Sequence, residues 1–126
     1  MPAYLLLKTI HLIGVFLTLI GVAGLAAHAA NGGRKRENTL YGLLTGLHGA
    51  GLLLVLLCGG GMLMQVMRSP GAPSPAWIAT KLVLWTLFAI AAVVPYRWPR
   101  LARGVLAVGL PALGALAVAV AVLKPF

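Results

Sequence analysis

Four long apolar runs, joined by short polar connections, take up nearly all of this 126-residue chain. A transmembrane helix needs about 20 mostly apolar residues to cross a hydrocarbon core of about 30 Å. The runs extend over about residues 3–29, 39–66, 77–96 and 101–123. They are continuously apolar rather than alternating, which favours helices over membrane-spanning strands. We therefore predict a single all-α, integral membrane domain over residues 1–126.

The chain is too poor in charged residues to be a soluble protein. Only 9% of its residues are charged, whereas 61% are hydrophobic. A soluble domain carries about 25% charged residues, because its surface must be solvated by water. The composition excludes a soluble enzyme, a disordered tail and a nucleic-acid-binding domain. The expected partner is the lipid bilayer, and no nucleic acid is expected.

The connections between the runs carry turn and helix-stop signals. Residues 31–33 read Asn-Gly-Gly, which can end a helix in a left-handed turn. Asn38 or Thr39 can then cap the second helix. Residues 69–75 are rich in proline and are expected to be non-helical. Because short connections favour antiparallel neighbours, we expect an antiparallel up-down bundle of four transmembrane helices.

The basic residues are unevenly distributed over the connections and predict an orientation. Most of them lie in or beside the first and third connections: Arg34, Lys35, Arg36, Arg97, Arg100 and Arg103. The second connection holds only Arg68. The positive-inside rule places the first and third connections in the cytoplasm. We therefore expect a multi-pass protein whose N- and C-termini both lie outside.

Polar side chains at membrane depth are the informative ones, because hydrocarbon cannot solvate them. On the first run Tyr4, Lys8 and His11 recur at intervals of three or four residues, which places them on one helix face. From the helical rise, His11 lies about 12 Å and Lys81, on the third run, about 6 Å from the outer side. The long lysine side chain can cover that difference. We expect His11 and Lys81 to meet, with Lys8 and Tyr4 beside them.

A second polar cluster is expected toward the cytoplasmic side. His28 lies near the end of the first run and His48 lies in the second. They can approach each other if tilt or a kink removes an axial offset of about 10 Å. Tyr96, at the end of the third run, is typical of an interfacial anchor.

The first cluster has the composition of a ligand set. A neutral imidazole and a neutral amine both bind metals, and facing helices of a bundle can hold a haem between two such groups. Gly14, Gly21, Gly51 and residues 59–61 leave room for a flat macrocycle. His11 and Lys81 are therefore the candidate ligands of a haem iron, and b-type haem or a related tetrapyrrole is the candidate cofactor.

Other roles stay open on the residues alone. Lys8 and Lys81 are near enough to the interface to snorkel, and His11 can bond a neighbouring helix, so these groups can be purely structural. Proton or ion conduction would need titratable groups across the membrane, and the runs contain no carboxylate. The small extramembrane mass also suits a non-enzymatic accessory or structural subunit of a larger membrane complex, or a homo-oligomer.

Two short motifs carry a family resemblance. Residues 4–11, Tyr-Leu-Leu-Leu-Lys-Thr-Ile-His, resemble the opening of the HemJ-type protoporphyrinogen oxidases, small bacterial membrane proteins of four or five helices. Residues 77–82, Trp-Ile-Ala-Thr-Lys-Leu, resemble their later Trp-x-x-x-Lys-Leu segment. The resemblance implies the bacterial inner membrane, and it implies that His11 and Lys81 ligate a b-type haem. The chain is also similar to uncharacterised bacterial four-helix membrane proteins that end in Lys-Pro-Phe, here residues 124–126.

Overall fold

The chain is helical almost throughout, as its apolar runs predict. The computed structural model describes residues 2–124, so the last two residues of the Lys-Pro-Phe end lie outside the described part. Within residues 2–124 there is no strand. The long helices are α1 (Pro2–Ala30), α2 (Tyr41–Val66), α3 (Pro75–Ala91) and α6 (Leu110–Leu123). The predicted all-α class is confirmed.

Three helical segments are long and apolar enough to cross a membrane: Pro2–Ala30, Tyr41–Val66 and Pro99–Leu123. The apolar helix α3 has 17 residues and is shorter than these. At about 1.5 Å per residue it extends over about 26 Å, slightly less than a typical hydrocarbon core. The structure is thus that of a multi-pass membrane protein with three clear candidate spans.

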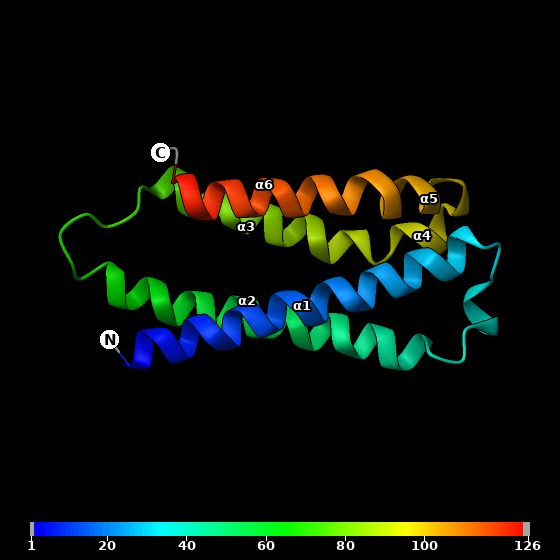
Figure 1. Ribbon diagram of the computed structural model, residues 1–126, viewed down its shortest axis with the longest axis horizontal. Coiled ribbons are helices and arrows are strands. Elements are labelled where there is room, and N and C mark those ends of the chain that lie inside the picture. The colour runs from blue at the N-terminus through cyan, green and yellow to red at the C-terminus, as the bar shows by residue number, and fades with distance from the viewer. Residues whose placement is uncertain (1, 125–126) are drawn as a thin grey trace.

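The long helices are arranged as two hairpins. Helix α1 lies beside α2, and α3 lies beside α6 (Figure 1). The start of α1, the end of α6 and the α2–α3 connection lie at one end of the molecule, here called the terminal end (Figure 1). The opposite end, here called the basic end, holds η1 (Lys35–Glu37), α4 (Val94–Arg97) and α5 (Ala102–Gly104).

The tightest packing joins α1 to α2, because glycines lie where the two helices cross. A methyl group built on Gly51 would lie 2.5 Å from the carbonyl oxygen of Gly14 and 2.5 Å from the amide nitrogen of Thr18. One built on Gly21 would lie 2.7 Å from the Cβ of His48. Small residues that let two backbones approach are the usual basis of helix packing in membranes. The space beside Gly14, Gly21 and Gly51, predicted to hold a macrocycle, is instead filled by the neighbouring helix.

Helix α1 ends in the predicted left-handed turn. Gly32 has φ +82°, a conformation that glycine adopts without the steric cost of a side chain. The N–H of Gly33 donates to the carbonyl of His28, and the N–H of Gly32 donates to that of Ala29, both at 3.0 Å. This pair of bonds is a Schellman motif and satisfies carbonyls that the helix end would leave free.

The start of α2 differs from the prediction. Leu40 precedes its first helical residue, and neither Asn38 nor Thr39 caps the helix. The Oδ1 of Asn38 instead accepts a hydrogen bond from the N–H of Leu40 at 3.0 Å. This local turn is a common alternative to capping for asparagine, and it leaves the Asn38 amide group free to donate elsewhere.

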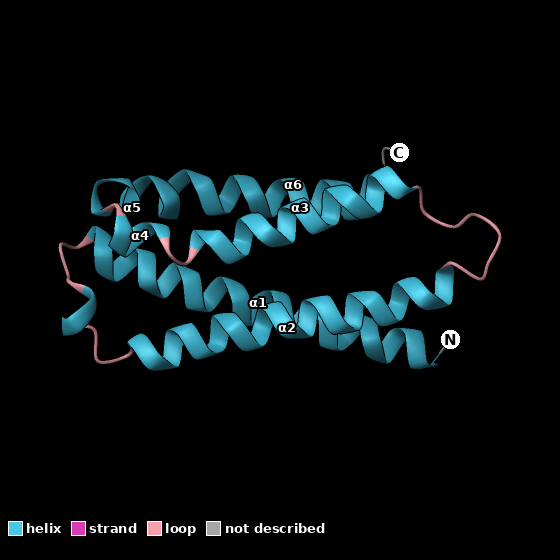
Figure 2. Cartoon of the chain, turned by 180° about the vertical axis from the view of Figure 1, so that it is seen from behind, coloured by secondary structure: helices cyan, strands magenta, loops and turns pink. Residues whose placement is uncertain are grey.

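The predicted third helix, over residues 77–96, is interrupted. Helix α3 ends at Ala91 and a separate short helix, α4, follows a two-residue break (Figure 2). Pro95 is the physical cause, because it has no N–H and its ring would clash with the carbonyl of Ala91, four residues earlier. Tyr96 is therefore carried on α4 rather than on α3.

The start of α3 also lies earlier than predicted. Pro75, expected in the non-helical connection, is the first residue of the helix. Proline is well suited to this position, since the first helical N–H has no partner within the helix. The Oγ of Ser74 caps the helix by accepting a hydrogen bond from the N–H of Trp77 at 3.2 Å.

The last helical segment contains one widened turn. After α5 it continues as the π-helical stretch η3 (Val105–Gly109) and then as α6. Pro111 cannot donate to Ala107, four residues earlier, so the α-helical pattern cannot continue regularly through this point. The N–H of Leu110 reaches back five residues to the carbonyl of Val105 instead, the spacing of a π-helix.

A small apolar core joins the two hairpins toward the basic end. It consists of Val22 on α1, Ala91 on α3 and Leu110 on α6, each at most 8% exposed. The short helices α4 and α5 also contact α1. Helices α2 and α3 make far fewer contacts with each other than α1 and α2 do, which leaves space between the hairpins.

The glycine contact can be tested with two substitutions on the same helix. Gly51→Val places a side chain against α1, and we expect it to lower the free energy of unfolding in detergent by about 1 to 3 kcal/mol, the cost typical of overpacking. Gly46→Val is the control, because a Cβ at Gly46 meets no atom within 4 Å. Equal melting temperatures for the two variants would contradict this packing.

Candidate functional site

His11 is held by a hydrogen bond across the α1–α2 contact. The side chain is half-buried, and its Nδ1 lies 3.0 Å from the carbonyl oxygen of Val55. Because a carbonyl can only accept, Nδ1 carries the proton, and in the neutral ring Nε2 is then the unprotonated nitrogen. A methyl group built on Gly59 would lie 3.2 Å from the imidazole Cε1. The bare backbone at Gly59 therefore provides the space for this ring.

Lys81 reaches the same region from α3. Its side chain is half-buried, and its Nζ lies 4.2 Å from the centroid of the Trp77 ring. A lysine over an indole is stabilised by the ring quadrupole. The Trp77 Nε1 in turn donates to the carbonyl of Val120 on α6 at 3.0 Å, so the indole that contacts Lys81 is itself fixed.

Lys81 has no acidic partner in the spans. The only acid of the chain is Glu37, which forms an ion pair with Arg34 at 3.2 Å, at the basic end. Both side chains of that pair are well exposed, so it contributes little to stability. The amino group of Lys81 is thus left to interact with the aromatic ring and with whatever occupies the space beside it.

Two cavities lie between the hairpins, and His11 and Lys81 line both of them. The smaller measures about 250 Å³ and the larger about 350 Å³. Both are also lined by Val55 and Trp85, so the two cavities adjoin around these four side chains. A mostly apolar cavity with a few convergent polar groups is the usual form of a small-molecule site.

The two cavities are lined by different sets of helices. The smaller one lies among α1, α2 and α3, and its other polar or aromatic lining includes Tyr4 and Trp77. The larger one is also lined by α6, through Gly114, Ala117, Val118 and Ala121. The polar groups are therefore concentrated toward the terminal end, and the apolar volume lies deeper in the bundle.

Trp85 connects the two hairpins beside the cavities. Its Nε1 donates to the carbonyl of Leu52 on α2 at 2.9 Å. An indole N–H buried in a membrane protein needs such a partner, because hydrocarbon offers none. The bond fixes α3 against α2 at the level where the cavities adjoin.

Three of the four residues expected in the first cluster line the cavities, and the fourth does not. His11 and Lys81 line both cavities, and Tyr4 lines the smaller one. Lys8 is exposed and lines neither. The interval of three or four residues predicted one shared face for Tyr4, Lys8 and His11. Residues four apart on an α-helix differ by about 40° in direction, and the part of α1 that lines the cavities does not extend to Lys8.

His28 and His48 have separate partners instead of one another. The Nδ1 of His48 donates to the carbonyl of Thr18 across the α1–α2 contact at 3.1 Å. The ring is only 5% exposed, and its Nε2 is buried without a partner among the described residues. His48 is thus part of the helix contact, next to Gly21.

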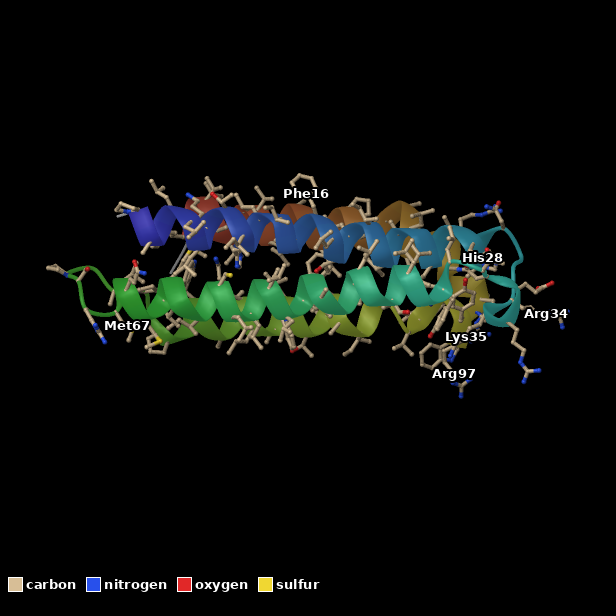
Figure 3. All side chains as sticks on the ribbon, turned by 90° about the horizontal axis from the view of Figure 1, so that it is seen from below. Phe16, His28, Arg34, Lys35, Met67 and Arg97 are labelled. Atoms are coloured by element: carbon tan, nitrogen blue, oxygen red, sulfur yellow. The ribbon has the colours of Figure 1, made fainter. Side chains whose placement is uncertain are left out.

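His28 belongs to a hydrogen-bonded group at the basic end that the sequence did not predict. The hydroxyl of Tyr96 donates to the Nδ1 of His28 at 2.6 Å, and it accepts from the Nδ2 of Asn38 at 2.9 Å. Tyr41 packs edge-on against Tyr96, with ring centroids 6.1 Å apart. Figure 3 shows His28 at the same end of the molecule as the labelled basic residues Arg34, Lys35 and Arg97. The three bonded residues join α1, the first connection and α4.

Among residues 2–124, no three His, Cys, Asp or Glu side chains gather in a group that could hold a metal ion. His11 and Lys81 therefore stand as a pair of nitrogen donors from two helices.

No known protein family, curated protein or solved structure matches the chain.

The group around Tyr96 makes a stability prediction. Tyr96→Phe removes the hydroxyl and leaves His28 and Asn38 without their shared partner, so we expect the free energy of unfolding to fall by about 1 to 2 kcal/mol. Tyr41→Phe is the control, because the Tyr41 ring is kept and its hydroxyl takes part in none of these bonds. Thermal unfolding in detergent measures both, and a larger effect for Tyr41→Phe would contradict the assignment.

Proposed function

We propose that this chain is a membrane protein that binds b-type haem or a related tetrapyrrole between its two hairpins. His11 and Lys81 would be the nitrogen ligands of the haem iron, and Tyr4 would line the same cavity. The observation that carries the proposal is that side chains from two different helices, both of them nitrogen donors, line the same pair of adjoining cavities.

The hydrogen bond of His11 supports this role. A histidine that ligates a metal almost always donates its other N–H to a carbonyl, carboxylate or water, which fixes the tautomer and the ring orientation. Here the carbonyl of Val55 has that position. The chain thus presents the unprotonated Nε2 of His11 in the form that an iron ligand requires.

The surroundings of the pair also suit a flat, apolar macrocycle. The larger cavity has a volume within the range of cofactor sites, the smaller one adjoins it, and both have a mostly apolar lining. Trp85 and Phe88 supply aromatic surface, and Gly114 and Ala117 leave space on α6. When bound, a haem supplies one-electron chemistry at its iron. The residues of this chain would hold it, orient it and exclude water from it.

The ligand assignment is tested by the optical spectrum of the protein reconstituted with hemin. We expect His11→Ala and Lys81→Ala each to weaken hemin binding by about 100-fold or more, since even partners of metal ligands contribute about 10- to 100-fold. Lys8→Ala is the matched control and should bind as the wild type does. Absence of a Soret shift in the wild type would contradict haem binding and favour the alternative, a non-enzymatic accessory subunit of a larger membrane complex.

We also propose that all four helical segments cross the membrane as an antiparallel up-down bundle. Helix α3 is apolar apart from Lys81 and its threonines, and it lies alongside α6, which belongs to a segment long enough to span (Figure 1). The basic residues of the first connection and of α4 and α5 lie together at the basic end. By the positive-inside rule that end would face the cytoplasm, in a bacterial inner membrane, with both termini outside.

The orientation makes a separate prediction. A reporter that is active only outside the cytoplasm should be active when fused after residue 126 and inactive when inserted at Gly33, which lies in the first connection. Alkaline phosphatase activity in whole bacterial cells measures this. Activity from the fusion at Gly33 alone would reverse the orientation, and equal activity at both positions would contradict an even number of spans.

A further inference from the structure

The smaller cavity has its mouth on the side of the molecule, between α2 and α3. Leu56 on α2 and Leu82 on α3 both line this cavity, yet they are 40% and 49% exposed. Gly60, one turn further along α2, also lines the cavity and is exposed. A residue that lines a cavity and is also exposed lies at its opening. These three residues define the mouth.

The mouth faces the hydrocarbon region of the bilayer. It lies on α2, one of the three helices long and apolar enough to span. The residues around it are large, apolar and exposed: Leu53 at 56%, Leu57 at 61% and Val83 at 58%. Apolar exposure on this scale, along a spanning helix, is the surface that contacts lipid tails. The cavity therefore communicates with lipid rather than only with water.

We propose that this mouth is a lateral entrance and that the ligand of the site is a flat, mostly apolar molecule dissolved in the bilayer, which enters between α2 and α3. The inference rests on the proposed tetrapyrrole site and adds the form in which the ligand arrives. The route leads from the apolar mouth to the polar groups of His11, Lys81 and Tyr4. A ligand with an apolar ring system and a few polar groups suits this route, because its ring can pass the apolar mouth and its polar groups can then contact the polar side chains.

Gly60 keeps the entrance open because it has no side chain. A Cβ built on Gly60 meets no atom within 4 Å, so a larger residue there would fit without disturbing the helices and would occupy the mouth. Gly49 is a matched control on the same helix. It is also exposed, a Cβ there also meets no atom within 4 Å, and it lines neither cavity.

The test compares the wild type, Gly60→Phe and Gly49→Phe in phosphatidylcholine vesicles. Hemin is supplied already dissolved in the bilayer of a second vesicle population, and the rate of the Soret shift is recorded. We expect Gly60→Phe to take up hemin about tenfold more slowly, which corresponds to an entry barrier raised by about 1.4 kcal/mol. Gly49→Phe should take it up at the wild-type rate. Uptake by Gly60→Phe at the wild-type rate would overturn the lateral entrance.

A second measurement separates the entrance from the proposed function. A wild type that shows no Soret shift would overturn the haem site, and the entrance is then decided by lipid contact alone. In a Trp77→Phe/Trp98→Phe background Trp85 is the only tryptophan, so its fluorescence can be excited selectively, and it lines both cavities. Lipids brominated along their acyl chains should quench it, and Gly60→Phe, but not Gly49→Phe, should reduce that quenching. Quenching that is unchanged in Gly60→Phe would overturn the entrance.

Discussion

The close backbone contact between α1 and α2 is the constraint on which the site depends. Glycines at 14, 21 and 51 allow the two helices to approach, and the approach brings carbonyl oxygens of each helix within reach of imidazoles on the other. His11 donates to Val55 and His48 donates to Thr18. In hydrocarbon no water competes for these donors, so the helix contact and the orientation of the histidines are set together.

The second hairpin is positioned by indole side chains. Trp85 donates to a carbonyl of α2, and Trp77 donates to Val120, near the end of α6, where helix carbonyls have no partner within the helix. Both tryptophans lie on α3, which has 17 residues. Of the four long helices only α6, with 14 residues, is shorter. The Trp85 bond sets the separation of the two hairpins beside the cavities, and the Trp77 bond holds α3 to α6 within the second hairpin.

The features that could be predicted from the sequence are those with a local physical cause. The apolar runs give the helices, and the glycine after Asn31 gives the left-handed turn that ends α1. The break before α4 has a local cause too, in Pro95, but a continuous apolar run concealed it. The bond between Tyr96 and His28 joins residues that are 68 positions apart, and no periodicity connects them. It arises because α4 folds back against the end of α1, which only the tertiary structure shows.

The candidate site was partly accessible to the same reasoning. Depth along the helices placed His11 and Lys81 at comparable levels, and the structure shows both lining the same cavities. Depth could not distinguish Lys8, because snorkelling lysines and inward-facing ones occur at the same levels of a helix. Nor could it separate His28 from His48, since the partner of each is fixed by which carbonyl or hydroxyl lies nearest.

The widened turn before Pro111 has a consequence for the wall of the larger cavity. A turn of i to i+5 spacing accommodates one residue more than an α-helical turn, and each residue of an α-helix advances the facing direction by about 100°. Every side chain after η3 is therefore rotated relative to an uninterrupted helix. After that rotation the half-buried Gly114 and Ala117 line the larger cavity, while the bulkier Val122 lines neither cavity and is 70% exposed. A single proline thus selects which side of α6 the interior meets, and so how much volume the interior has.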